Sequence, residues 1–318
     1  MKLRDLFGIK KKVIVAIEEK VEEKVEELEE VPTDREYQIG KYKLLLKDFH
    51  VLDLYQNTYP LYDQFLPAFC KNFKGLIIDV GANIGDTAIS IFAQNNHSFI
   101  VSVEPDLEFV NSCISSITDN GLVDRSLIVN KFVSTKTGNF VVKKNESLST
   151  GSIEECETDE NKINNTLSFS ELMDLIPNDK KNNFDILKID TDSFDWDIIH
   201  SFVQYVKKDG IKPRFVFFEM QTFINNNESS DEGRDVIIEN YRTALIELKE
   251  LGYIKFCLLD NFGTYFKTTE SVEEIIELAH YIRRSQLFNS HSTIYYFDVL
   301  AYAENEMDFV KNTLIEIY

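Results

Sequence analysis

A short unit of strand, glycine-containing turn and helix constrains the fold of this chain more than any other feature. The strand is the apolar run Gly75–Val80 (GLIIDV), the turn contains Gly81 and Gly85, and the helix covers Ile84–Ala93. Glycine lets the backbone turn sharply and lets a ligand approach it closely, because no Cβ is in the way. The unit therefore predicts a buried strand with a ligand site at its carboxyl end.

The same alternation continues along the chain. Further strands are expected at Phe99–Glu104, Ser126–Val133, Phe184–Asp190, Phe215–Glu219 and Tyr253–Leu259, and further helices at Glu108–Ile117, Trp196–Val206 and Val236–Leu251. Strands that alternate with helices at this interval are typical of parallel crossovers. The sequence thus predicts an α/β fold with helices on both faces of a mostly parallel sheet. Thr293–Tyr302 is expected to be an antiparallel edge strand near the C-terminus.

Composition excludes several classes of protein. The chain has 318 residues, of which 43% are hydrophobic and 28% are charged, and its formal net charge is −20. A surface this negative repels phosphate backbones, so we expect no nucleic-acid partner. No apolar run approaches the roughly 20 residues that a transmembrane segment needs. The basic N-terminus lacks the apolar core of a signal peptide, so a cytoplasmic location is expected.

Three segments are expected along the chain. Residues 1–31 should form an amphipathic charged helix, because apolar residues recur at spacings of three and four before Pro32. This helix could dock on the rest of the protein, self-associate weakly through residues 13–30, or lie on a membrane surface. Residues 32–74 are expected to be a cap or lead-in segment with a strand pair, and residues 75–318 the main domain.

The spacing within the glycine turn discriminates between ligands. A dinucleotide-binding turn has the pattern GxGxxG, in which the second glycine makes room for pyrophosphate. Here Asn83 and Asp86 occupy the second and third glycine positions, and an acid at a helix N-terminus is a poor neighbour for phosphate. S-adenosylmethionine (SAM), which has an amino-acid tail and no phosphate, fits better. Glu104, at the end of the next strand, is placed to accept hydrogen bonds from ribose hydroxyls.

Three motifs occur in an order that is typical of one family. With LIIDVGANIGDTA, SVEPD and LKIDTDSFDWDII, the sequence resembles the FkbM family of SAM-dependent methyltransferases from about Tyr37 to Tyr302. The resemblance implies a Rossmann-like fold with a seven-stranded sheet, and makes residues 75–318 the methyltransferase domain. It also implies that Glu104 holds the ribose and Asp106 lies beside the adenosine. The methionine end of SAM would be held by Asp79, Gly81, Asn83, Gly85, Asp86 and Thr87.

A second acidic cluster begins in the third motif. Asp190, Asp192, Asp195 and Asp197 lie there, and Glu219 ends the next strand. Like-charge crowding raises the pKa of at least one carboxyl group toward neutrality, which suits a general base. We expect Asp190, and then Asp192, to be the base or to orient the substrate, with Glu219 close by. Asp190 could instead bind the amino group of SAM. A divalent cation is possible at these acids, but no metal site is predicted.

One departure from the family affects the substrate. The family commonly has Asp-Val-Glu-Gly where this chain has Asp190-Thr191-Asp192-Ser193. The acids are kept and the glycine is lost. This departure weakens the assignment of the family's substrate class to this chain more than the assignment of its reaction. The leading hypothesis is an O-methyltransferase that acts on a hydroxyl of a sugar, a glycan or another small polar metabolite. The alternative is a noncatalytic module with the same fold, which binds a partner through its acidic N-terminal helix.

Overall fold

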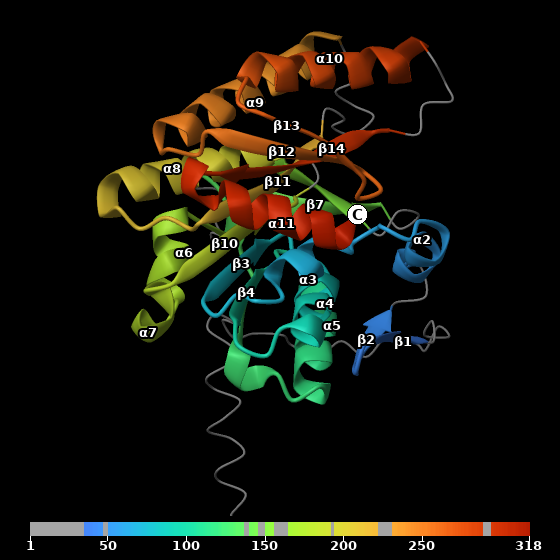
Figure 1. Ribbon diagram of the computed structural model, residues 1–318. Coiled ribbons are helices and arrows are strands. Elements are labelled where there is room, and N and C mark those ends of the chain that lie inside the picture. Colours follow the sequence, from blue (N-terminus) through green and yellow to red (C-terminus); the bar gives the residue numbers. More distant parts are fainter. Residues whose placement is uncertain are drawn as a thin grey trace, which may run out of the picture.

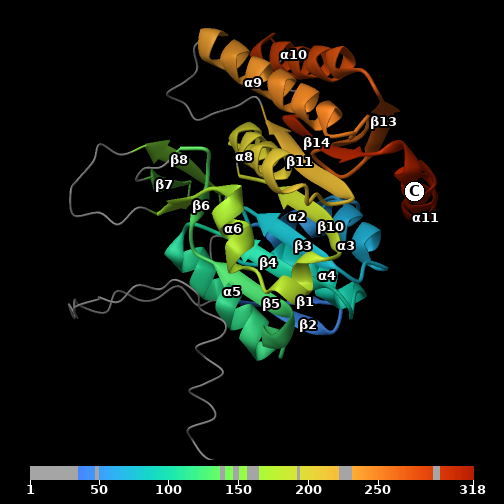
Figure 2. The same ribbon diagram turned by 90° about the vertical axis from the view of Figure 1, so that its left-hand side faces the viewer.

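The architecture is a large twisted sheet with helices on both faces (Figure 1; Figure 2). The structure is a computed structural model that describes residues 35–46, 50–136, 140–145, 150–155, 165–191, 194–221, 231–288 and 294–318. The described residues form one eight-stranded sheet in the order β13-β12-β14-β11-β10-β3-β4-β5. Its strands are β3 (Leu76–Val80), β4 (Phe99–Val103), β5 (Ser126–Val129), β10 (Phe184–Ile189), β11 (Phe215–Gln221), β12 (Lys255–Asp260), β13 (Tyr265–Thr269) and β14 (Tyr296–Tyr302).

The central strands are parallel, as the sequence predicts. β5, β4, β3, β10 and β11 pair in parallel in that spatial order. Both faces of these strands are covered by helices, which explains why their sequences are almost continuously apolar. Because all five run in the same direction, their carboxyl ends meet at one edge of the sheet, where ligands bind in such folds.

Two expectations about the sheet are wrong. β14 is antiparallel as predicted, but it lies between β11 and β12 and not at an edge. The sheet has eight strands and not seven, because the chain turns back after β12 and adds β13 in a hairpin. The Asp260 side chain stabilises this turn by accepting hydrogen bonds from the N–H groups of Phe262 and Thr264, and Gly263 there has a positive φ of 81°.

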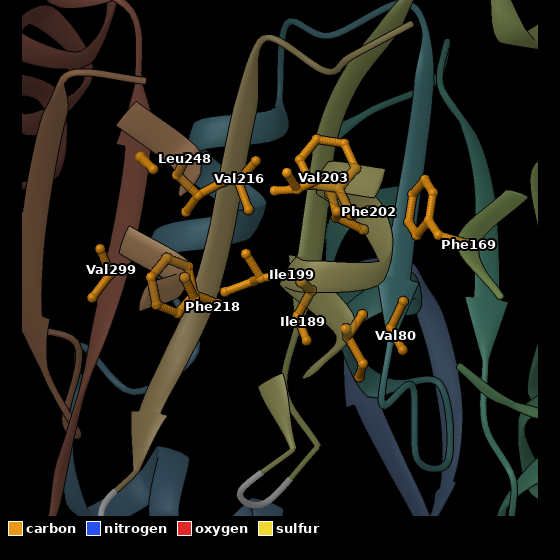
Figure 3. Packing of buried hydrophobic residues seen from close by; sticks show 14 of the residues in the cluster. Val80, Phe169, Ile189, Ile199, Phe202, Val203, Val216, Phe218, Leu248 and Val299 are labelled. Carbon is orange, nitrogen blue, oxygen red and sulfur yellow. The ribbon is translucent and has the colours of Figure 1, made fainter. Parts of the chain in front are cut away.

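The sheet divides the hydrophobic core into two layers, each covered by helices. One layer is covered by α6 (Phe169–Leu175), α8 (Asp195–Asp209), α9 (Asp231–Glu250) and α10 (Val272–Phe288). Figure 3 shows this layer, in which Phe218 of β11 lies beside Ile199 of α8, and Phe202 of α8 faces Phe169 of α6. The other layer is covered by α3 (Phe65–Cys70), α4 (Asp86–Gln94), α5 (Leu107–Asp119) and α11 (Met307–Ile317).

The lead-in segment packs onto the second layer. Its predicted strand pair is present as the antiparallel hairpin of β1 (Arg35–Ile39) and β2 (Tyr42–Leu46). Leu44 and Leu46 of β2 are buried in the same core as α4 and α5. The short helix α2 (Leu52–Thr58) follows and leads into α3. The expected helix over residues 1–31, and with it the self-association surface at 13–30, lies outside the described residues.

Smaller elements complete the described chain. The strand expected at Ser126–Val133 is divided into β5 and β6 (Phe132–Val133), and β6 pairs with β9 (Thr166–Leu167). β7 (Phe140–Asn145) and β8 (Thr150–Glu155) form an antiparallel pair, and α7 (Asn178–Lys181) precedes β10. Two single turns of 3-10 helix occur at Val123–Arg125 and Glu304–Glu306. No helix within the described ranges has the length and apolar character to span a membrane.

Candidate active site

The glycine turn after β3 is folded tightly against its neighbours. Gly81 has a φ of 84°, and a Cβ added there would lie 1.7 Å from the backbone oxygen of Asp190. Gly85 has a φ of 85°, and its Cβ would lie 2.7 Å from Sγ of Cys113 in α5. Asn83 also adopts the left-handed conformation, with a φ of 48°. The turn therefore needs glycine at 81 and 85 both for its dihedral angles and for space.

Glu104 connects this turn to the next strand. Its carboxylate accepts a 2.9 Å hydrogen bond from the N–H of Asn83 and another of 2.9 Å from the N–H of Asp106. Asp106 is the N-cap of α5, where its side chain accepts hydrogen bonds from the N–H groups of Glu108 and Phe109. A carboxylate offers about four lone-pair positions, so Glu104 can hold the turn and accept further hydrogen bonds from a ligand.

A first pocket, which we call the turn pocket, lies beside this turn. It encloses about 580 Å³ of space, part of which is open to solvent. Its polar lining includes Gly81, Asn83, Glu104 and Asp190, and its apolar lining includes Val103, Phe109, Phe132 and Val133. The lining thus combines polar backbone, two carboxylates and the charged Lys131 with apolar side chains.

Charged residues form a row across four neighbouring strands on the face beneath α3 and α4. Lys188 of β10 lies opposite Asp79 of β3, and Glu219 of β11 lies opposite Asp298 of β14. Each of the four is two positions from a residue of the second core layer: Ile77, Ile186, Phe217 and Leu300. Since side chains alternate between the faces of a sheet, all four point to that face.

Lys188 links two of the predicted acids. Its Nζ lies 2.9 Å from Oδ1 of Asp79 and 3.2 Å from Oδ2 of Asp190. The Asp79 residue is 0% exposed, whereas 43% of the Asp190 side chain is exposed. Lys188 therefore anchors the Asp190 carboxylate from below and leaves part of it facing outward.

Burial changes the ionisation of this row. It raises the pKa of Asp79 to about 6, although the ammonium of Lys188 acts in the opposite direction. Burial disfavours the charged form of Lys188, but the carboxylates of Asp190 and Asp79 outweigh it and hold the pKa of Lys188 well above its ordinary value. Burial, followed by the charges of Asp190 and Asp63, raises the pKa of Asp298 well above its ordinary value. The carboxyl groups with raised pKa values, Asp79 and Asp298, thus lie outside the acidic cluster named from the sequence, and the main cause of both shifts is burial and not like-charge crowding.

A second pocket, which we call the acidic pocket, lies above this row. Its volume is about 710 Å³. Tyr62 and Asp63, from the segment between α2 and α3, line it together with Tyr296 of β14. The charged residues that line it are Asp63, Asp86, Lys188, Asp190, Glu219 and Asp298. Asp190 lines both pockets, so the two pockets meet at this residue.

The structure brings most of the predicted site residues to these two pockets. Gly81, Asn83 and Glu104 line the turn pocket, and Glu219 lines the acidic pocket. Asp86 and Thr87, which are expected to hold the methionine end of SAM together with Gly81 and Asn83, line the acidic pocket and not the turn pocket. The remaining predicted residues support the site from outside the pocket linings: Asp79 beneath the row, Gly85 against Cys113, and Asp106 as a helix cap. Asp192 lies outside the described residues.

Two acids of the predicted cluster have structural partners. Asp195 accepts hydrogen bonds from the N–H and the hydroxyl group of Thr191. Asp197 accepts from the hydroxyl groups of Ser134 and Thr135 and thereby ties β6 to α8. Neither lines either pocket. Within the described residues, no group of three or more His, Cys, Asp and Glu side chains is arranged to hold a metal ion.

Sequence reasoning missed Asp63 and Asp298. Asp298 is the one charged residue in the apolar segment TIYYFDVLAY, which was a usable signal, because a charge inside a buried strand is costly. Asp63 lies in an aromatic stretch and has a φ of 56°. Its sequence context indicates neither this conformation nor a place in the site. Both residues come from segments that only the tertiary structure places over the carboxyl ends of β10 and β11.

Comparison with known proteins places the chain in a family. The profile described as "Methyltransferase FkbM domain" matches residues 79–255, more than half of the chain. Among solved structures, an O-methyltransferase from Bacillus cereus in complex with SAH is similar at 14% identity, over 79% of this chain and 88% of that chain, with a TM-score of 0.40. The O-methyltransferase TomG from Streptomyces achromogenes, in complex with SAM, is 10% identical over 76% and 79%, with a TM-score of 0.41. No curated protein matches the chain significantly in sequence. On the strength of the profile match, the chain belongs to the FkbM methyltransferase family.

Proposed function

We propose that this protein transfers the methyl group of SAM to a hydroxyl group of a sugar, a glycan or another small polar acceptor. Family membership supports methyl transfer. The observation that carries the finer assignment is the meeting of the turn pocket and the acidic pocket at Asp190. A transfer between two small molecules needs two adjoining sites with a polar group at their junction. Family membership does not favour a noncatalytic module.

The turn pocket suits SAM. Gly81 packs against the Asp190 backbone, and Gly81 and Asn83 bring the backbone of the turn to the lining of the pocket. Glu104 offers carboxylate oxygens to the ribose hydroxyls, and Phe109, Phe132 and Val133 offer an apolar wall to the adenine. Its lining includes the carboxylates of Glu104 and Asp190 and no phosphate-binding pattern, which suits a cofactor that is positively charged at its amino group and sulfur. When bound, SAM supplies a methyl group activated by that positive sulfur.

Asp190 is the residue that we propose to act on the acceptor. The Lys188 ammonium fixes its carboxylate, and the exposed part of that carboxylate faces the junction of the pockets. Asp190 would orient the acceptor hydroxyl and take its proton as the oxygen–methyl bond forms and the sulfur–methyl bond breaks, with SAH as the leaving group. Orientation can supply about 7–11 kcal/mol, and general base catalysis about 10²–10⁴-fold in rate. Asp192, two residues further on, is retained as a second candidate for the same role.

The cofactor is tested first, by calorimetric titration of the full-length protein with SAM and, as a control, NAD. We expect micromolar binding of SAM alone, and its loss in the variant that combines Asp79→Ala with Glu104→Ala. Binding of NAD in place of SAM would refute the cofactor assignment.

The reaction is then tested with methyl-labelled SAM and a panel of sugars, glycans and small polyols. We expect Asp190→Asn to keep SAH binding and to lose about 10²–10⁴-fold of turnover. An Asp308→Asn variant, which changes an exposed acid on α11, should retain full activity. Label on nitrogen or carbon would contradict O-methylation, and full activity of Asp190→Asn would contradict the role of Asp190.

A further inference from the structure

We propose that His50 is a positioning residue for SAM, which holds the side chain of Asn83 in the glycine turn through a hydrogen bond from its ring Nε2. The inference rests on the proposed function, because it concerns the same cofactor site. It gives the lead-in segment a part in cofactor binding, although His50 lies before the first of the three family motifs.

His50 is held at the start of α2 by its backbone and by its ring. The Arg35 guanidinium of β1 donates a hydrogen bond to the His50 carbonyl oxygen and two more to the carboxylate of Asp53 in α2. The ring Nδ1 accepts a 3.3 Å hydrogen bond from the N–H of Leu52. His50 is only 7% exposed, and buried polar atoms normally have a partner. The ring is therefore fixed in place, and its other nitrogen, Nε2, needs a partner of its own.

That partner is in the glycine turn. The His50 side chain hydrogen-bonds the side chain of Asn83, and the charge of Asp86 at the start of α4 acts on the ring. A neutral imidazole has one donor and one acceptor. Because Nδ1 accepts from Leu52, Nε2 carries the ring proton and donates to the amide oxygen of Asn83. This Oδ1 also accepts a 2.8 Å hydrogen bond from the N–H of Ile84, so the tautomer fixes which end of the amide faces His50.

The residue that His50 holds is a strained part of the cofactor site. Asn83 has a φ of 48°, a left-handed conformation that is unfavourable for a residue with a Cβ. Its N–H donates to Glu104, the carboxylate that we assign to the ribose. Asn83 lines the turn pocket, whereas His50 lines neither pocket. His50 therefore acts on SAM through Asn83 and not by direct contact.

Protonation of the ring gives the proposal a second signature. The charged groups that face His50 are Asp86 of α4, Arg35 of β1 and Asp53 of α2. Burial lowers the pKa of His50 below its ordinary value, and the two acids oppose this shift only in part, so the ring is neutral at pH 7. As pH falls, the second proton enters at Nδ1, which faces the N–H of Leu52. A histidine cation has two donors and no acceptor, so acid breaks this contact and releases the ring from its position.

The test separates the two ring nitrogens with two amide substitutions. Glutamine places its amide near the position of Nε2 and asparagine near that of Nδ1, so His50→Gln keeps a donor to Asn83 and His50→Asn keeps only an acceptor for the Leu52 N–H. SAM binding to the full-length protein is measured by calorimetry at pH 7, with urea unfolding alongside. We expect His50→Asn to raise the dissociation constant roughly 3- to 10-fold, as the loss of one hydrogen bond predicts. His50→Gln should raise it by no more than about twofold. The control is His97→Asn, which changes an exposed histidine before β4 and should have no effect.

A glycine at position 83 tests whether His50 acts through this residue. Asn83→Gly removes the amide and keeps a residue suited to the left-handed turn. In this background His50→Asn should not weaken SAM binding further. In the methyl-transfer assay, His50→Asn alone should raise KM for SAM and leave kcat at saturating SAM unchanged.

The pH dependence completes the test. From pH 7 to about pH 5, the SAM affinity of the wild type should fall more steeply than that of His50→Gln, which has no titrating ring. Asp79, whose pKa is about 6, is present in both proteins and does not affect the comparison. Equal affinities of His50→Asn and His50→Gln, or an undiminished effect of His50→Asn beside Asn83→Gly, would overturn the proposal. Failure of the wild type to bind SAM would instead count against the proposed function itself.

Discussion

Replacing Lys188 by methionine tests whether the buried charges of the sheet are coupled as described. Lys188 lies between Asp79 and Asp190, and the side chains of Lys188 and Asp79 are 6% and 1% exposed. Removing one partner of a buried ion pair leaves the other charge uncompensated, which typically costs about 3–5 kcal/mol. We expect Lys188→Met to lower the free energy of unfolding at pH 7 by about this amount.

The pH dependence of this stability loss follows from the pKa of Asp79. Its pKa is about 6 in the folded protein with Lys188 present, against about 3.9 for an unperturbed aspartate. A carboxyl group with a raised pKa contributes stability that is fully present below its unfolded pKa and lost as pH rises through its folded pKa. For Asp79 this loss is about 2 kcal/mol between pH 4 and pH 7. Without Lys188 the folded pKa is higher still, so the deficit of the variant should be much smaller at pH 5 than at pH 7.

The assay is urea unfolding at pH 5 and pH 7 of wild type, Lys188→Met, Asp79→Asn and the double variant. We expect the double variant to be more stable than Lys188→Met alone, because the asparagine needs no ion partner. The control is Lys207→Met, which removes a surface ion pair with Glu250 and should cost no more than about 1 kcal/mol. Additive effects of the two single changes, or a loss below about 1 kcal/mol for Lys188→Met, would refute the reasoning.

Three further predictions follow from the site. Gly81→Ala should abolish SAM binding and destabilise the protein in urea, because the added Cβ would meet the Asp190 backbone. The control is Gly121→Ala, which has a similar φ of 68° and open space around it and should cost only about 1 kcal/mol of stability. Equal losses of stability in the two variants would contradict this account. Burial raises the pKa of Asp298 well above its ordinary value, so the stability that this carboxyl group contributes is lost as pH rises through the folded pKa. Asp298→Asn should therefore reduce the fall of the thermal midpoint as pH rises; an unchanged pH dependence of the midpoint would argue against the raised pKa. Asp106→Ala should lower the free energy of unfolding by about 1 kcal/mol, because α5 loses its N-cap, and the variant should still bind SAM. Loss of SAM binding at unchanged stability would instead show that Asp106 contacts the cofactor directly.

Most of the fold can be predicted from the local pattern of the sequence. Apolar strands such as Leu76–Val80 and the glycine turn after it depend on dihedral angles and burial within a few residues, so they can be predicted without the rest of the chain. The parallel direction of the central strands can be predicted in the same way, because helices lie between them in the sequence. The place of β14 and the existence of β13 depend instead on which edges remain available once the central sheet has formed, and the local pattern does not contain that information.

The same division applies to the site. The sequence by itself determined the acids and glycines at the carboxyl ends of β3, β4, β10 and β11, because parallel strands bring those ends to one edge. Only the tertiary structure decided that Lys188 pairs with Asp79, that Asp298 faces Glu219, and that Asp63 lies over the acidic pocket. These contacts join segments that are far apart along the chain. Their register is set by how whole strands and helices pack, whereas a local sequence pattern reflects only the burial and conformation of neighbouring residues.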